Sequence, residues 1–92
     1  MQPIDTERPI GVISDTHGLL RPEVLIMLEG CGLILHLGDV GSRDEDAAIL
    51  EWLGELAPVE AVRGNIDTAP WAERLPHTRD LVVSGWRLHL PL

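Results

Sequence analysis

Residues 10–18 read Ile10-Gly11-Val12-Ile13-Ser14-Asp15-Thr16-His17-Gly18, a short apolar run that ends in a polar turn. The same arrangement occurs twice more. Leu33-Ile34-Leu35-His36-Leu37 leads into Gly38-Asp39-Val40, and Val59-Glu60-Ala61-Val62 leads into Arg63-Gly64-Asn65-Ile66-Asp67. Short apolar runs bounded by Gly or Pro predict strands that are buried on both faces of a parallel sheet.

Two segments between these runs have the spacing of apolar residues that is typical of amphipathic helices. The first helix is expected at about 22–29, where Pro22 suits an early helical position and Gly30-Cys31-Gly32 ends the pattern. In the second segment, Ser42 and Glu45 predict a capping box, and Pro58 stops the helix. The apolar positions are Val24, Leu25, Met27 and Leu28 in the first segment and Ile49, Trp52, Leu53 and Leu56 in the second.

The resulting pattern is βαβαβ, in which strands joined by helical crossovers should be parallel and right-handed. Near the end of the chain, the apolar stretches 80–83 and 86–90 flank Ser84-Gly85, which predicts a two-residue β-hairpin. We therefore expect an α/β fold with a βαβαβ parallel sheet and a C-terminal hairpin. A chain of 92 residues has room for one domain, so residues 1–92 are assigned to a single domain.

Composition excludes several classes of function. A formal net charge of -8 argues against an extensive nucleic-acid surface, and no apolar run approaches the roughly 18 residues needed to cross a membrane. The start of the chain does not read as a signal peptide, and the single Cys31 cannot form an internal disulfide, so we expect a cytoplasmic protein. Five acidic residues are assigned to the solvent-exposed face of the second helix and to no site: Asp44, Glu45, Asp46, Glu51 and Glu55.

The polar turns contain the candidate metal-binding residues. Ligands of parallel sheets collect beyond the carboxyl ends of the strands, so Asp15, His17, Asp39 and Asn65 should converge on one rim. Oxygen donors combined with an imidazole favour first-row divalent ions such as Mn, Fe, Ni or Zn over calcium. A bridging carboxylate would allow two ions about 3.5 to 4 Å apart, which can supply hydroxide and hold a phosphoryl group for in-line attack. Phosphate ester hydrolysis is the reaction that this donor set favours.

The three turns resemble the D-x-H, G-D and G-N motifs of the calcineurin-like metallophosphoesterases. The residues in and around these motifs are similar to those of small bacterial and archaeal phosphodiesterases related to the retromer subunit Vps29. The resemblance spans residues 9 to about 91. It implies that Asp15 and His17 bind a first metal ion, that Asp39 bridges two ions, and that Asn65 binds the second. Asp39 and Asn65 would thereby serve catalysis. It also implies that the fold is one half of an αββα sandwich.

The chain departs from this family pattern at two places. Many members have His where Ile66 stands, and that His orients the phosphate or protonates the leaving group, which Ile cannot do. Good leaving groups would then be favoured, although the small phosphodiesterase branch commonly lacks this His too. The family also continues beyond the strand at 86–90 with further His ligands. We therefore expect a truncated domain that corresponds to the family's amino-terminal half, in which an incomplete metal site binds ions weakly.

Other residues have more than one interpretation. His36 is expected to be a hydrogen-bonded core residue rather than a metal ligand, and His89 a strand residue rather than a substitute ligand. Cys31 is interpreted as a small buried residue. Arg63 would either meet the phosphate of a substrate or form a surface salt bridge.

Two classes of function remain open at this stage. The first is a metal-dependent phosphoesterase that acts on a phosphate-ester small molecule and is impaired by its incomplete site. The alternative is a non-catalytic interaction module, as in the retromer subunit, or an inactive remnant. A homodimer is also expected, because the strand at 86–90 should leave apolar side chains and a free edge without cover.

Overall fold

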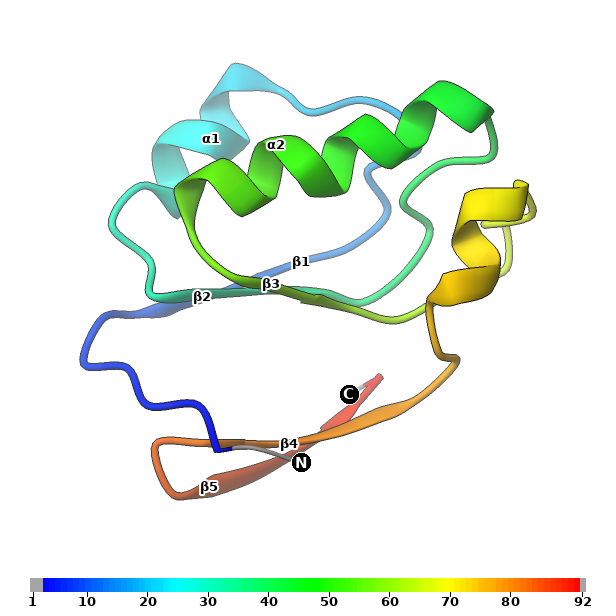
Figure 1. Ribbon diagram of the computed structural model, residues 1–92. Coiled ribbons are helices and arrows are strands. Elements are labelled where there is room, and N and C mark those ends of the chain that lie inside the picture. The colour runs from blue at the N-terminus through cyan, green and yellow to red at the C-terminus, as the bar shows by residue number, and fades with distance from the viewer. Residues whose placement is uncertain (1–2, 92) are drawn as a thin grey trace.

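A parallel sheet of three strands forms the centre of the structure, a computed structural model that describes residues 3–91. Its strands are β1 (Ile10–Ile13), β2 (Leu33–His36) and β3 (Val59–Ala61), and β2 lies between the other two. Both pairs are parallel, as Figure 1 shows. The predicted α/β class and the parallel βαβαβ unit are confirmed.

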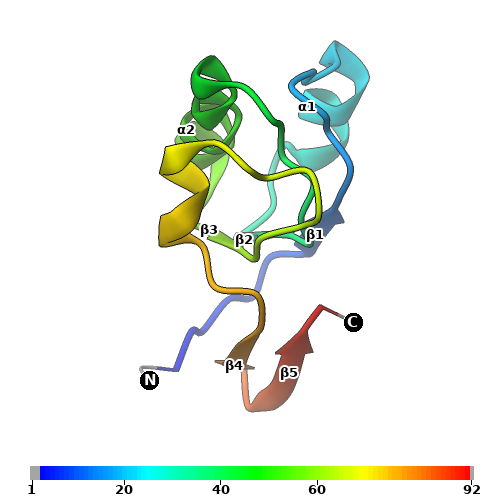
Figure 2. The ribbon, with the colours of Figure 1, turned by 90° about the vertical axis from the view of Figure 1, so that its right-hand side faces the viewer.

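Helices cover one face of this sheet and a β-hairpin lies against the other, so the chain forms three layers (Figures 1 and 2). The helices are α1 (Pro22–Leu28) and α2 (Ala48–Leu56), with short 3-10 turns η1 (Asp44–Ala47) and η2 (Pro70–Arg74). The hairpin consists of β4 (Arg79–Val83) and β5 (Trp86–Leu90), which pair antiparallel. The turn residues Ser84 and Gly85 have φ angles of 48° and 86°, which suit the two-residue hairpin that the sequence predicts.

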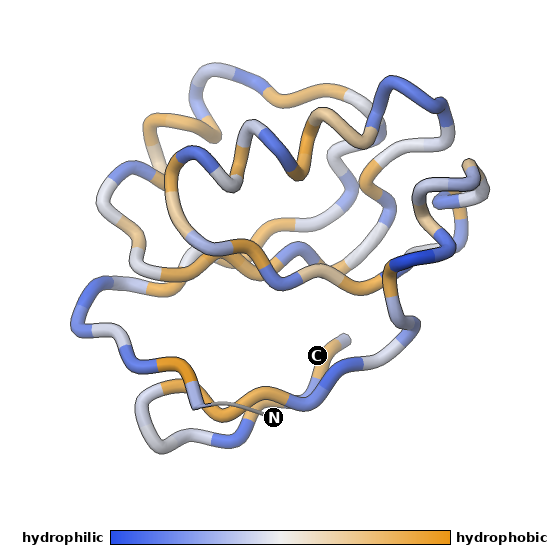
Figure 3. Tube along the Cα trace, viewed as in Figure 1, coloured by the Kyte–Doolittle hydropathy of each residue, from blue (hydrophilic) through white to orange (hydrophobic). Residues whose placement is uncertain are grey.

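Two hydrophobic cores lie on opposite faces of the sheet, because side chains alternate along β2. Apolar residues follow the strands of both layers in Figure 3. The core beneath the helices contains Leu28, Cys31, Ile34, Val40, Ile49, Leu53 and Ala57. The core between the sheet and the hairpin contains Leu33, Leu35, Val62, Leu81, Val83 and Leu90. Burial of Cys31 agrees with its predicted role as a small core residue.

The prediction that all three strands are buried on both faces is correct only for the central strand β2. In β1, Ile10 and Val12 are 38% and 48% exposed. Within residues 3–91, β1 is an edge strand that pairs with β2 alone, so its other edge has no neighbouring strand. The prediction for α2 is also partly wrong, since Ile49 and Leu53 are buried while Trp52 is 52% exposed. Trp52 belongs to the neighbouring row of the helix surface, beyond the face that meets the sheet.

The start of the second helical segment differs from the predicted capping box of Ser42 and Glu45. The 3-10 turn begins at Asp44, and the carboxylate of Asp46 accepts a hydrogen bond from the backbone N–H of Arg43 at 2.9 Å. Asp46 is buried, so its assignment to an exposed helix face is wrong. A carboxylate near the first turn of a helix satisfies N–H groups that have no helical partner, which explains why Asp46 turns inward.

The N-terminal segment pairs with the hairpin, which the sequence did not indicate. Ile4 forms a parallel bridge with Val83. The N–H of Ile4 donates to the carbonyl of Val82 at 2.8 Å, and the N–H of Ser84 donates to the carbonyl of Ile4 at 2.7 Å. One edge of the hairpin is therefore occupied locally by the chain's own start.

Candidate metal centre

The turns that follow β1 and β2 are joined side by side by backbone hydrogen bonds. The N–H of Asp15 donates to the carbonyl of Gly38 at 3.0 Å, and the N–H of His17 donates to the carbonyl of Asp39 at 3.0 Å. A third bond runs from Gly18 to Val40 at 2.7 Å. Parallel pairing thus continues past the ends of the strands and fixes the two turns against each other.

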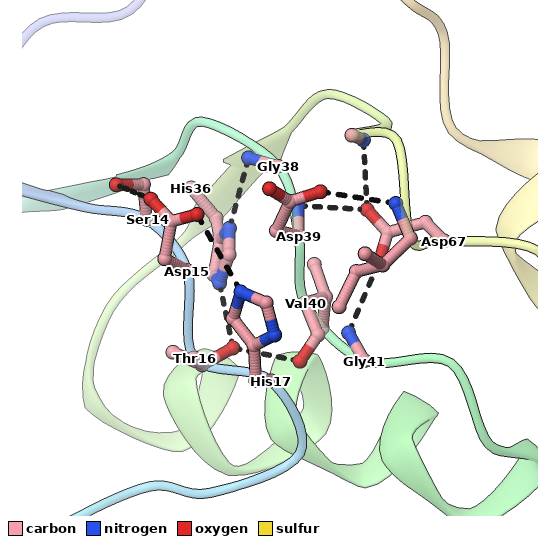
Figure 4. A network of polar contacts seen from close by, with 12 residues as sticks. Ser14, Asp15, Thr16, His17, His36, Gly38, Asp39, Val40, Gly41 and Asp67 are labelled. Carbon is pink, nitrogen blue, oxygen red and sulfur yellow. Dashed lines mark hydrogen bonds and ion pairs between the residues drawn. The ribbon is translucent and has the colours of Figure 1, made fainter.

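This pairing brings together three of the four predicted metal ligands. Asp15, His17 and Asp39 each offer one ligand atom, and these atoms all lie within 4.8 Å of one another. The side chains face one another in Figure 4, and the Nε2 atom of His17 is 3.6 Å from an oxygen of Asp15. Asp15 and His17 are exposed and Asp39 is half-buried, so an ion can reach all three from solvent.

The backbone at these three residues is in a conformation that residues other than glycine rarely adopt. The φ angles of Asp15, His17 and Asp39 are 57°, 50° and 57°. Among residues 3–91, Ser84 in the hairpin turn is the remaining case outside glycine. Such a left-handed conformation costs on the order of 1 kcal/mol or more per residue and persists where the surroundings enforce it. The three donor side chains are thus aimed at one point by constrained backbone.

The charges of the cluster favour a cation. Two carboxylates held within a few ångströms of each other repel, and a positive ion between them removes that repulsion. A hydrogen bond of 2.7 Å from the Ser14 hydroxyl is the largest of the effects that hold the pKa of the Asp15 carboxyl below its usual value. Asp15 therefore stays ionised and available as a ligand. Two carboxylates and an imidazole fit the first-row divalent ions predicted from the sequence.

His36, at the end of β2, supports the first turn from within the core. The N–H of Gly38 donates to Nδ1 of His36 at 3.2 Å, so the ring proton is on Nε2, which donates to the hydroxyl of Thr16 at 3.0 Å. That hydroxyl donates onward to the carbonyl of Val40 at 2.8 Å. Burial lowers the pKa of His36 to about 4, although nearby carboxylates act in the opposite direction. The predicted role as a hydrogen-bonded core residue is confirmed, and the chain of bonds fixes Thr16 between Asp15 and His17 (Figure 4).

The third turn is held against Asp39. The N–H of Ile66 donates to a carboxylate oxygen of Asp39 at 3.1 Å. Gly38 has a φ angle of 109°, and a side chain there would come within 2.9 Å of the backbone of Gly64. A side chain on Gly64 would in turn collide with the backbone nitrogen of Asp39. Asn65 is exposed on this turn.

Asp67 is a residue of the site that the sequence interpretation did not single out. It is only 3% exposed, and its carboxylate accepts three backbone hydrogen bonds. The donors are the N–H groups of Asp39 at 2.9 Å, Gly41 at 3.0 Å and Gly64 at 2.8 Å. Its position three residues after Gly64, in a Gly-Asn-x-Asp turn, was the available signal, because acidic side chains often bond to nearby backbone in turns.

Two further candidate residues, His89 and Arg63, form contacts outside the cluster. His89 is exposed on β5 and its Nδ1 lies 2.6 Å from a carboxylate oxygen of Asp80, in agreement with a strand residue. Arg63 forms no ion pair with a carboxylate within residues 3–91, and instead contacts Nε2 of His77 at 2.7 Å. Of the two alternatives for Arg63, the surface salt bridge is not seen among these residues. Because a guanidinium only donates, Nε2 of His77 must accept that bond.

A cavity of about 510 Å³ opens beside the cluster of Asp15, His17 and Asp39. Asp15 and His17 lie on its wall together with Leu19, Val24 and Arg21. Arg21 directly precedes α1, is exposed, and makes no ion pair with a carboxylate in the described part of the chain. The cavity therefore combines an acidic cation-binding group with one positive side chain.

Comparison with known proteins identifies the family. Residues 9–91 match the calcineurin-like phosphoesterase superfamily domain, and the chain belongs to this family of metallophosphoesterases. It is 42% identical over 86 residues to a protein named "Probable metallophosphoesterase" from Methanothermobacter thermautotrophicus. That alignment covers 88% of this chain and 47% of the relative, so the chain spans about half the length of the curated relative. No solved structure gives a significant match. Within residues 3–91, no helix is long and apolar enough to cross a membrane.

Proposed function

We propose that this chain is a metal-dependent phosphoesterase domain that binds divalent ions through Asp15, His17, Asp39 and Asn65. The observation that carries the proposal is the convergence of Asp15, His17 and Asp39 within 4.8 Å, each on left-handed backbone. Family membership supports the same reaction class. Mn²⁺ is the ion we expect, with Fe, Ni or Zn as alternatives, because the donors mix carboxylate oxygen with imidazole nitrogen.

The residues have distinct roles in this proposal. Asp39 would bridge two ions, and Asn65 would bind the second. Divalent ions held there would lower the pKa of a water molecule and offset the charge of a phosphoryl group. Arg21, on the wall of the cavity, would pair with the phosphate of the substrate. Ile66 cannot protonate a leaving group, so we expect a preference for esters whose leaving group is stable as an anion.

The substrate that suits this site is a small phosphodiester or phosphomonoester. A cavity of about 510 Å³ accommodates such a molecule. A formal net charge of -8 disfavours a long polyanion such as nucleic acid. We place the protein in the cytoplasm on the strength of its single, buried cysteine.

The test is hydrolysis of an activated aryl phosphodiester with and without Mn²⁺, in wild type, Asp39→Asn and Asp80→Asn. We expect slow turnover that requires added metal, disappears in Asp39→Asn and persists in Asp80→Asn, since Asp80 lies on the hairpin and contacts His89. Slow turnover is expected because the three clustered donors fill only part of a metal coordination sphere. Equal activity in wild type and Asp39→Asn would disprove the assignment.

A second candidate function is a protein-interaction module that forms a homodimer. Large apolar side chains favour it, since Ile10, Val12 and Trp86 are 38%, 48% and 76% exposed. Exposed apolar surface of this kind is common at sites of protein association. Loss of hydrolysis together with preserved self-association would favour this function over the first.

A further inference from the structure

The carboxylate of Asp67 connects two of the three turns that carry the candidate metal ligands. One oxygen accepts from the N–H groups of both Asp39 and Gly64, at 2.9 and 2.8 Å. The other accepts from Gly41 at 3.0 Å. Figure 4 shows Asp67 beside Asp39, on the side away from Asp15, with its oxygens directed at the backbone of Asp39 and Gly41. Asp67 is thus not itself among the converging ligands.

The backbone that Asp67 holds is conformationally constrained. Asp39 has a φ angle of 57°, and the loop around it places Gly38 against Gly64 with no space for a side chain. Hydrogen bonds to a charged group contribute more than bonds between neutral groups. Three such bonds on one buried side chain can therefore maintain a strained turn and fix the distance between Asp39 and the Asn65 turn.

We propose that Asp67 is a positioning residue for metal binding, which holds Asp39 and the turn of Asn65 at the separation that two ions require. This inference rests on the proposed function, since it assumes that those residues bind metal. Asp67 would touch no ion, yet its substitution should change the metal affinity measurably. Residues that orient metal ligands typically change affinity by about 10- to 100-fold when they are altered.

Asp67→Asn is the informative substitution because it preserves size and shape. A carboxylate presents two acceptor oxygens, whereas an amide presents one oxygen and one NH₂ group. In Asp67→Asn, at least one of the N–H groups of Asp39, Gly41 and Gly64 must face another donor. The turn should then lose its fixed position while the hydrophobic cores stay intact.

The experiment measures Mn²⁺ affinity by calorimetry, and amide hydrogen exchange and chemical shifts in the metal-free protein. The control is Val83→Ala, which destabilises the buried core next to the hairpin and leaves the turns untouched. We expect Asp67→Asn to weaken Mn²⁺ binding by about 10- to 100-fold and to speed exchange at Asp39, Gly41 and Gly64. Val83→Ala should lower thermal stability and leave affinity unchanged. If Asp67→Asn fails to fold, Asp67→Glu tests the same bonds with the charge retained.

The outcomes separate this inference from the proposed function. If the wild type fails to bind Mn²⁺, the proposed function is wrong. Hydrogen exchange at the amides of Asp39, Gly41 and Gly64 would still show whether Asp67 holds the turns. Equal Mn²⁺ affinity in Asp67→Asn and wild type would overturn the positioning role. A loss of affinity in Val83→Ala as large as that in Asp67→Asn would also overturn it, because general destabilisation would then explain both.

Discussion

Protonation of His36 should destabilise the fold as the pH falls below 6.5. The ring is fully buried, with Nδ1 accepting from Gly38 and Nε2 donating to Thr16, so both nitrogens are satisfied only in the neutral form. A second ring proton would face the N–H of Gly38. Burial accordingly lowers the pKa of His36 from 6.5 to about 4.

The size and direction of the effect follow from this difference. Above pH 6.5 the imidazole is neutral in both the folded and the unfolded chain, and the contribution of His36 to stability is constant. Between pH 6.5 and 4 the unfolded chain binds a proton that the folded chain does not, so the free energy of unfolding falls as the pH is lowered. At about 1.4 kcal/mol per pH unit, the loss approaches roughly 3 kcal/mol at pH 4 and is near 2 kcal/mol at pH 5. This is a large part of the total stability of a small domain.

The assay is urea denaturation followed by tryptophan fluorescence at pH values from 7.5 to 4.5. His36→Gln should be less stable than wild type at pH 7.5, because hydrogen bonds to Gly38 and Thr16 are disturbed, but its stability should depend less on pH. His89→Gln is the matched control, since His89 is exposed on the hairpin and should leave the wild-type slope unchanged. If His36→Gln retained the full loss of stability between pH 6.5 and 4.5, the explanation through His36 would be refuted.

Four further predictions concern the site and the surface. Asp39→Ala should abolish most Mn²⁺ binding in calorimetry. A variant that binds Mn²⁺ as tightly as wild type would contradict the role of Asp39 as the shared ligand. Gly64→Ala should cost about 1 to 3 kcal/mol in chemical denaturation, because its Cβ would collide with the backbone of Asp39; an unchanged midpoint would show that the turns can separate freely. Arg21→Gln should raise KM several-fold for a small phosphodiester with little change in kcat, and an unchanged KM would place the substrate elsewhere. Analytical ultracentrifugation should show concentration-dependent dimers that Trp86→Lys weakens, since Trp86 is 76% exposed; a monomer at all concentrations would argue against self-association.

The order of strands and helices was predictable because each element has a local signal. Apolar runs at 10–13 and 33–37 give β1 and β2, and Ser84-Gly85 marks the hairpin. The convergence of Asp15 and Asp39 was also predictable, since the ends of parallel strands meet at one edge of a sheet. These features depend on neighbours in sequence or on the general geometry of sheets.

The polar groups within the fold were harder to predict, because their partners are distant in sequence. Asp46 was interpreted as an exposed helix residue, yet it is buried, and Asp67 received no role although it bonds to Asp39 and Gly41. From sequence alone, an acidic residue is predicted to be solvent-exposed unless the N–H groups that bond to it are known. Pairing of Ile4 with Val83 likewise depends on the free edge of a strand formed at the other end of the chain.

Paramagnetic broadening by Mn²⁺ can decide whether Asp15, His17, Asp39 and Asn65 together form a metal centre. A ¹H–¹⁵N spectrum recorded with substoichiometric Mn²⁺ reports which amides lie near the bound ion, without requiring catalysis. We expect selective loss of signals from residues 14–18, 38–41 and 64–67, with the hairpin at 86–90 unaffected. Broadening centred instead on the exposed acidic residues Glu51 and Glu55 of α2, with sharp signals at Asp15 and Asp39, would contradict it.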